Sequence, residues 1–221
     1  MFRSAFLIMA AWCAAPQSAV AEPHPLPPPF GLTWGDSPGR LVSWARRTGL
    51  DQVVREPGGN RRLAILTVSS PKGQLPDHDA SSLEARFIDG RLYEVAVHYT
   101  YPGRKADFVK GRFMALKRLL SVRHGRFKPA GVRQEAREGV VTESESYQVK
   151  PVPDAYLLLA LTEVRDALRG DAAARFSAIY HNDGILVEDQ QRIEIRRDSG
   201  FDLPAAESSG ECPPPSPRSW R

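Results

Sequence analysis

An alternating run of apolar and polar residues, interrupted by Asp89-Gly90, constrains the fold of this chain more than any other feature. The run extends from Leu83 to Tyr99. An Asp-Gly pair between two alternating segments is the strongest short-range signal of a β-hairpin, because both turn residues tolerate positive φ. The chain therefore contains an antiparallel sheet.

The register of this hairpin follows from which side chains share a face. A two-residue turn pairs Phe87 with Leu92 and places Glu94 on the apolar face. A three-residue loop ending at a left-handed Gly90 pairs Phe87 with Arg91 instead, and the apolar side chains of both strands then share one face. We predict the three-residue loop, because a buried face specifies its register strongly.

Two segments carry helix signals. Ser37 is a suitable N-cap before Pro38, and Gly49 is suited to end a helix over 37–48. A second helix is predicted over 105–122. Its apolar residues fall on one stripe at helical spacing: Val109, Phe113, Leu116 and Leu120.

Strand signals fill most of the remaining chain, and we find no internal sequence repeat. Residues 155–168 fit either a helix or a strand, but preceding prolines and a possible partner over 176–180 favour a strand. Gly139 lies in a polar connection, where we expect no need for the positive φ that favours glycine. Further strands are predicted over 62–69, 140–149, 185–187 and 192–195. The fold class predicted is α+β, with a single antiparallel sheet of about six strands and two helices packed on one face.

Residues 1–21 have the order of features of a secretory signal peptide. Arg3 precedes an unbroken apolar run of eleven residues over 5–15, and Ala19-Val20-Ala21 is a small-x-small cleavage site. We predict cleavage between Ala21 and Glu22 and a periplasmic location. Eleven residues are too few to span a bilayer, which needs about 20, so no transmembrane span is expected in the mature chain.

Proline-rich segments flank the expected domain. We predict a proline-rich arm over 22–29, a single α+β domain over 30–200, and a disordered Pro/Ser-rich tail over 201–221. The chain has two cysteines. Cys13 leaves with the signal peptide, so Cys212 remains alone and no internal disulfide is expected.

Two motifs resemble those of known proteins. Residues 30–37 read Phe-Gly-Leu-Thr-Trp-Gly-Asp-Ser, and residues 87–92 read Phe-Ile-Asp-Gly-Arg-Leu. This pattern resembles a group of uncharacterised bacterial exported domains that begin with Phe-Gly-[Ile/Leu]-x-Trp-Gly-x-Ser and carry an aromatic-x-Asp-Gly-[Lys/Arg]-Leu hairpin. The resemblance covers residues 30–125. It implies a periplasmic α+β domain and no particular activity.

The sequence offers no catalytic or metal-binding motif that we recognise. Nucleotide-binding glycine loops, a Gly-x-Ser-x-Gly elbow and a His-Glu-x-x-His motif are absent. Asp77-His78-Asp79 is the only compact set of metal-ligand types, and we interpret it as a solvated loop. We therefore predict no catalytic residues, no metal and no cofactor.

One stretch is strongly basic. Residues 104–133 carry ten Lys or Arg and a single acid, a net charge of +9 in a chain whose formal charge is +4. The predicted anion-binding residues lie on the second helix, with Lys110, Lys117 and Arg118 expected to point away from its apolar stripe: Lys110, Arg112, Lys117 and Arg118. Such a surface attracts anionic partners. We expect an anionic envelope component or another envelope protein, and no nucleic acid.

These features together favour a non-enzymatic binding or envelope-assembly module with a basic helix face. Two alternatives stay open, namely a small envelope hydrolase with an unrecognised site and a structural accessory subunit without a ligand. A deep pocket lined by polar groups would favour the hydrolase. A flat basic or apolar patch would favour the binding module.

Overall fold

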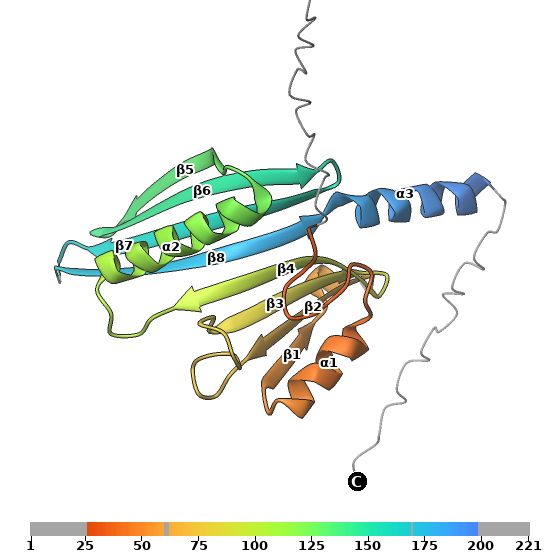
Figure 1. Ribbon diagram of the computed structural model, residues 1–221, viewed down its shortest axis with the longest axis horizontal. Coiled ribbons are helices and arrows are strands. Elements are labelled where there is room, and N and C mark those ends of the chain that lie inside the picture. The colour runs from red at the N-terminus through yellow and green to blue at the C-terminus, as the bar shows by residue number, and fades with distance from the viewer. Residues whose placement is uncertain (1–25, 60–61, 169, 199–221) are drawn as a thin grey trace, which may run out of the picture.

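A computed structural model describes residues 26–59, 62–168 and 170–198 (Figure 1). The predicted signal peptide, the start of the predicted proline-rich arm, the tail predicted over 201–221 and Cys212 lie outside the described residues. The helices are α1 (Pro38–Arg47), α2 (Ala106–His124) and α3 (Asp183–Asp198), with a short 3-10 turn, η1, over Pro57–Gly59. The strands are β1 (Asp51–Arg55), β2 (Leu63–Ser69), β3 (Ser82–Ile88), β4 (Arg91–Thr100), β5 (Lys128–Arg137), β6 (Val140–Val152), β7 (Ala155–Asp166) and β8 (Asp171–Asn182).

The sheet corrects the predicted fold. The described residues form one antiparallel sheet of eight strands in the order β1-β2-β3-β4-β8-β7-β6-β5, together with three helices. The α+β class is compatible with this structure, but the expected six strands and two helices are wrong. The edge strand β5 was missed because all ten of its residues are exposed. An edge strand without a buried face shows no alternation of apolar residues.

The segment expected to form two short strands over 185–187 and 192–195 is instead the helix α3. Its β-branched residues at two-residue spacing imitate a strand. The helix begins with a side-chain cap, since the Ile185 N–H donates to Asn182 Oδ1 at 3.3 Å. Ile185 and Asp189, four residues apart, are both buried on one side of the helix. By contrast, the strand predicted over 155–168 is confirmed as β7.

The backbone contains a repeat that the sequence does not show. A helix followed by a four-stranded meander occurs twice, as α1-β1-β2-β3-β4 and as α2-β5-β6-β7-β8. The two meanders join through their last strands, because β4 pairs with β8 in antiparallel register with Val97 opposite Ala178. Both α1 and α2 pack on the same face, where their buried residues belong to one core cluster with the inward side chains of the sheet.

The β3–β4 hairpin uses a different register from the predicted one. Asp89 and Gly90 form a two-residue turn, with φ of 46° and 74°, and Phe87 lies opposite Leu92. A bulge at Tyr93 then shifts the phase of β4, so that Val95 lies opposite Ala85 on the core face. The apolar side chains therefore do share a face, but the extra residue sits in the strand and not in the loop.

The end of α1 agrees with the sequence analysis. Pro38 occupies the first turn, and Gly49 has φ of 67° directly after the helix. The Leu50 N–H donates to the Ala45 carbonyl at 2.9 Å, and the Gly49 N–H donates to the Arg46 carbonyl at 3.3 Å. This is the Schellman arrangement, and Leu50 is buried in the core.

The N-terminal chain is anchored before α1 begins. Leu26, within the predicted arm, is only 2% exposed and belongs to the core. The Trp34 indole N–H donates to the Leu26 carbonyl at 2.7 Å, which fixes the segment between them. Across the three described ranges, no helix has the length and apolar character needed to cross a bilayer.

The structure assigns a positive φ to two hairpin glycines, Gly90 at 74° and Gly139 at 82°. The expectation that Gly139 carries no backbone demand is therefore wrong. We predict that Gly90→Val and Gly139→Val each lower the free energy of unfolding by about 1–3 kcal/mol, because a β-branched residue is strained in this region. Urea unfolding measures the effect.

Gly111→Ala is the matched control, since Gly111 lies inside α2 with open space around its missing Cβ. It should raise stability by about 0.5–1 kcal/mol. A Gly139→Val midpoint equal to that of the unchanged protein would contradict the assigned turn.

Candidate functional site

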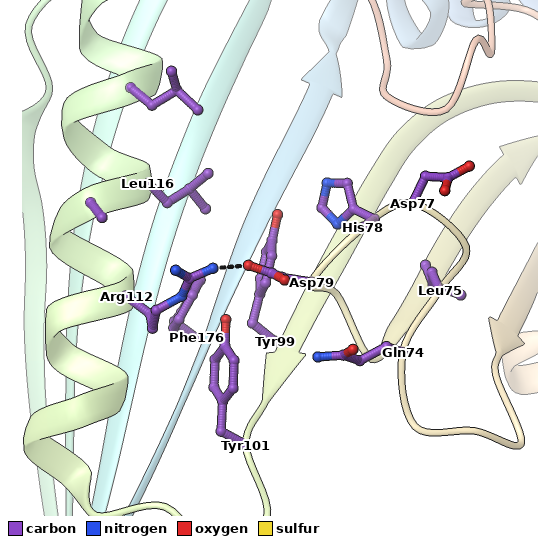
Figure 2. A pocket seen from close by; sticks show the side chains of 12 residues that line it. Gln74, Leu75, Asp77, His78, Asp79, Tyr99, Tyr101, Arg112, Leu116 and Phe176 are labelled. Atoms are coloured by element: carbon purple, nitrogen blue, oxygen red, sulfur yellow. Dashed lines mark ion pairs between the residues drawn. The ribbon is translucent and has the colours of Figure 1, made fainter.

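A cavity lies between α2 and the loop that joins β2 to β3, and Figure 2 shows the side chains around it. We call it the aromatic cavity. Its volume is about 680 Å³. The lining residues come from the 74–79 loop, the end of β4, α2 and β8: Gln74, Leu75, Asp77, His78, Asp79, Tyr99, Tyr101, Arg112, Ala115, Leu116, Leu119 and Phe176.

The floor of the aromatic cavity is built by the central strand pair. Tyr99 of β4 lies directly opposite Phe176 of β8, and their rings stack with centroids 4.5 Å apart. Tyr101 continues the floor, with its ring 6.2 Å from Phe176. Burial raises the pKa of the Tyr99 hydroxyl far above its ordinary value, which disfavours its anionic form.

The 74–79 loop, which faces α2 across the aromatic cavity, is held in a fixed shape by its own contacts. The Leu75 N–H donates to the Ala80 carbonyl at 2.8 Å, and both residues are buried. His78 Nδ1 accepts the Ala80 N–H at 3.1 Å, and the imidazole packs between Phe30 and Tyr99. Burial lowers the pKa of His78, which favours the neutral ring that this hydrogen bond requires.

An ion pair between Arg112 of α2 and Asp79 of the loop crosses the cavity (Figure 2). Both side chains are about half exposed. Pairs of this kind contribute only about 0–1 kcal/mol, because water solvates each partner well. The contact can therefore open at low cost in free energy.

The helix α2 presents apolar side chains in two directions. Val109, Phe113 and Leu120 are buried in the core, which confirms most of the predicted stripe. A second set is exposed, and it includes Phe108 and Leu119, the latter 68% exposed beside the aromatic cavity. This second set was missed, although Phe108, Leu119 and Val122 also follow helical spacing.

The structure separates the four predicted anion-binding residues. Lys110 Nζ lies 2.5 Å from a carboxylate oxygen of the buried Glu163 on β7. Lys117 Nζ lies 3.0 Å from the centroid of the Tyr147 ring on β6, and burial lowers its pKa. Both therefore point toward the sheet and not away from it. Arg112 lines the aromatic cavity, and Arg118 is exposed without an ion pair to any described residue.

The aspartates of the Asp77-His78-Asp79 motif line the cavity on either side of its histidine. Within residues 26–59, 62–168 and 170–198, no group of three or more His, Cys, Asp or Glu side chains is arranged to hold a metal ion. The sequence analysis did not identify Tyr99, Tyr101 and Phe176 as residues of a site. The only sequence signal for them is that Tyr99 and Tyr101 flank Thr100.

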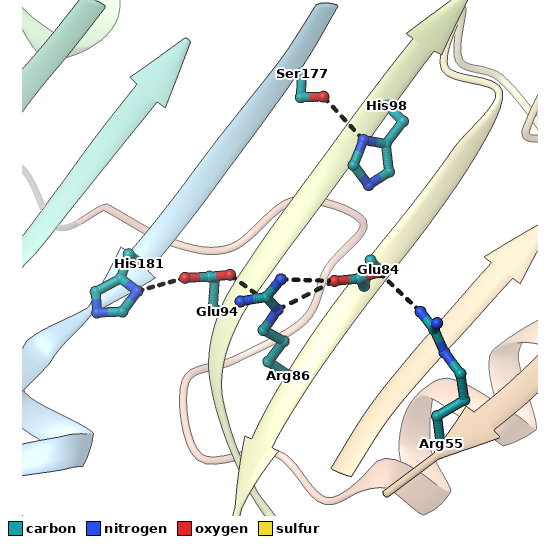
Figure 3. Close-up of polar contacts among 7 residues, drawn as sticks. All are labelled: Arg55, Glu84, Arg86, Glu94, His98, Ser177 and His181. Atoms are coloured by element: carbon teal, nitrogen blue, oxygen red, sulfur yellow. Dashed lines mark hydrogen bonds and ion pairs between the residues drawn. The ribbon is translucent and has the colours of Figure 1, made fainter. Parts of the chain in front are cut away.

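A polar network lies on the opposite face of the sheet (Figure 3). Arg86 of β3 contacts both Glu84 and Glu94, at 3.0 and 3.3 Å. His181 of β8 has Nδ1 2.8 Å from Glu94 and Nε2 2.9 Å from Asp183 at the start of α3. These charges are satisfied by one another, so the network ties β3, β4, β8 and α3 together.

His98 and Ser177 form a separate pair on this face, with Nδ1 2.9 Å from Oγ (Figure 3). Burial lowers the pKa of His98. The two residues lie opposite each other on β4 and β8 and join the halves of the sheet.

The aromatic cavity has both a volume large enough for a ligand and a lining of apolar and polar side chains. It is therefore the candidate functional site.

No family model matches this chain, and a search of curated proteins finds no significant match either.

Glu163 gives the structure a defined response to acid. Its hydrogen bonds to Arg165 and Lys110 lower its carboxyl pKa from 4.5 to about 2. A lowered pKa stabilises the fold above the unfolded value and loses that effect as pH falls toward 2. We predict that Glu163→Gln costs about 1–3 kcal/mol at pH 6 and almost nothing at pH 2, as measured by urea unfolding across this range.

Glu135→Gln on the exposed strand β5 is the control. It should change the free energy of unfolding by less than about 0.5 kcal/mol at either pH. A difference between the Glu163→Gln variant and the unchanged protein that stays constant with pH would refute the assigned pairing.

Proposed function

We propose that this protein is a non-enzymatic binding module of the bacterial periplasm that holds an apolar group in the aromatic cavity. The observation that carries the proposal is the exposed Leu119 at the wall of a cavity whose floor is the buried, stacked pair of Tyr99 and Phe176. Apolar surface that borders a cavity gains free energy when a ligand covers it, about 25 cal/mol per Å². Export through the signal peptide over 1–21 belongs to the same proposal.

The polar groups of the cavity support binding over catalysis. Asp79 and Arg112 neutralise each other, and His78 uses Nδ1 to hold its own loop. Tyr99 keeps its proton because burial raises its pKa. These groups orient and recognise a ligand through contacts, and none is paired in the manner of a nucleophile with its base.

The proposed binding surface is narrower than the basic helix face expected from the sequence. Lys110 and Lys117 are engaged with the sheet, which leaves Arg112 as the predicted anion-binding residue that borders the cavity. The module therefore recognises its ligand in a cavity and not over a broad charged surface.

Binding of the neutral fluorescent probe N-phenyl-1-naphthylamine tests this proposal. The probe should fluoresce more strongly with the protein, and Leu119→Glu should weaken its affinity about tenfold, which corresponds to 1.4 kcal/mol. A charge on this wall would oppose an apolar ligand.

Val122→Glu on the same helix is the matched control, because Val122 is 90% exposed and does not line the cavity. It should bind the probe like the unchanged protein, and urea midpoints confirm that both variants fold. Equal losses in the two variants, or no binding by the unchanged protein, would reject the aromatic cavity as the site.

A further inference from the structure

A second cavity adjoins the aromatic cavity and has a different chemical character. We call it the basic cavity. Its volume is about 620 Å³, and it shares Tyr101, Asp79 and Arg112 with the aromatic cavity. The Arg112–Asp79 ion pair lines both cavities, and we call the two together the groove.

The basic cavity carries more positive than negative charge. Lys72, Arg104 and Arg112 line it, and Asp79 is its only carboxylate. Arg104 is held over the ring of Phe108, with its guanidinium carbon 5.2 Å from the centroid. In the described part of the chain, neither Lys72 nor Arg104 forms an ion pair. Two cations are thus available, and a third is held by a weak surface pair.

The groove therefore has an aromatic end, which carries the carboxylates of Asp77 and of the Arg112-paired Asp79, and a cationic end. We infer that it binds a single-chain amphiphile with a phosphate monoester head group, whose head lies among Lys72, Arg104 and Arg112 and whose chain lies against Leu119 in the aromatic cavity. This inference rests on the proposed function and names the ligand class of the same site. A phosphate monoester carries close to two negative charges at neutral pH, which matches the local excess of two positive charges.

Asp79 has a defined part in this assignment. It competes with the head group for Arg112, because a guanidinium binds carboxylate and phosphate with the same fork of N–H donors. The ligand must replace Asp79 at Arg112 to occupy the whole groove. Removing the Asp79 charge should therefore strengthen binding of the phosphate and leave binding of an uncharged chain unchanged.

The test compares dodecyl phosphate with dodecyl maltoside, a neutral amphiphile of equal chain length, both below the concentrations at which they form micelles. Isothermal titration should give a dissociation constant for dodecyl phosphate that rises at least tenfold in the double variant Lys72→Glu/Arg104→Glu. Dodecyl maltoside should bind this variant as it binds the unchanged protein. Asp79→Asn should bind dodecyl phosphate about three- to tenfold more tightly.

The double variant Arg118→Glu/Arg126→Glu changes the net charge equally and lies outside both cavities. It should bind dodecyl phosphate within twofold of the unchanged protein. Equal losses in the two double variants would show a general charge effect and overturn the assignment of the head group. If inorganic phosphate displaced bound dodecyl phosphate as effectively as added dodecyl phosphate does, the chain would contribute nothing to binding. That result would overturn the assignment of one end of the groove to the head group and the other to the chain.

The probe experiment separates the two proposals. If the naphthylamine binds at Leu119 but the Lys72→Glu/Arg104→Glu variant keeps its affinity for dodecyl phosphate, the ligand class is wrong and the aromatic cavity stands. If neither the naphthylamine nor dodecyl phosphate binds, both the assigned ligand class and the proposed function are wrong.

Discussion

The antiparallel pairing of β4 with β8 is the contact on which the other features of this structure depend. It joins two meanders that would otherwise each end at an open strand, and Val97 and Ala178 are buried at its centre. The same register places Tyr99 opposite Phe176, which creates the floor of the aromatic cavity. A shift of β8 by one residue along β4 would turn Phe176 to the face of the sheet opposite Tyr99. The candidate site is therefore a direct product of the central strand register.

The position of α2 follows from this arrangement. The helix lies across β6, β7 and β8, where Phe113 packs edge-on against Phe176 (Figure 1). Lys110 and Lys117 reach Glu163 and Tyr147 on the strands below, so their charges help to seat the helix. The side of α2 that faces the β2–β3 loop keeps Arg112 and Leu119 beside the cavity. One helix thus supplies both core packing and the wall of the proposed site.

The sequence predicts best those features that local contacts determine. The place of the turn at Asp89-Gly90 and the end of α1 at Gly49 depend on backbone conformations that few residues adopt, and both are found, although the turn has two residues and not the predicted three. The bulge at Tyr93 was not predicted, because the same alignment of apolar side chains on one face can be reached by placing the extra residue in the loop or in the strand. The strand β5 was not predicted because it has no buried face and so no alternation of apolar residues. The helix α3 was not predicted because it carries residues typical of strands. The aromatic cavity could not be predicted, since Tyr99, Arg112 and Phe176 meet only in the folded sheet.

The central claim is that the groove beside α2, and no other surface, receives the ligand. Amide chemical-shift mapping by NMR during a titration with dodecyl phosphate tests it most directly. The account predicts that the largest changes fall in residues 72–81, 99–104 and 108–119. Changes centred on the opposite face of the sheet, around Glu84, Glu94 and Ser177, would contradict it.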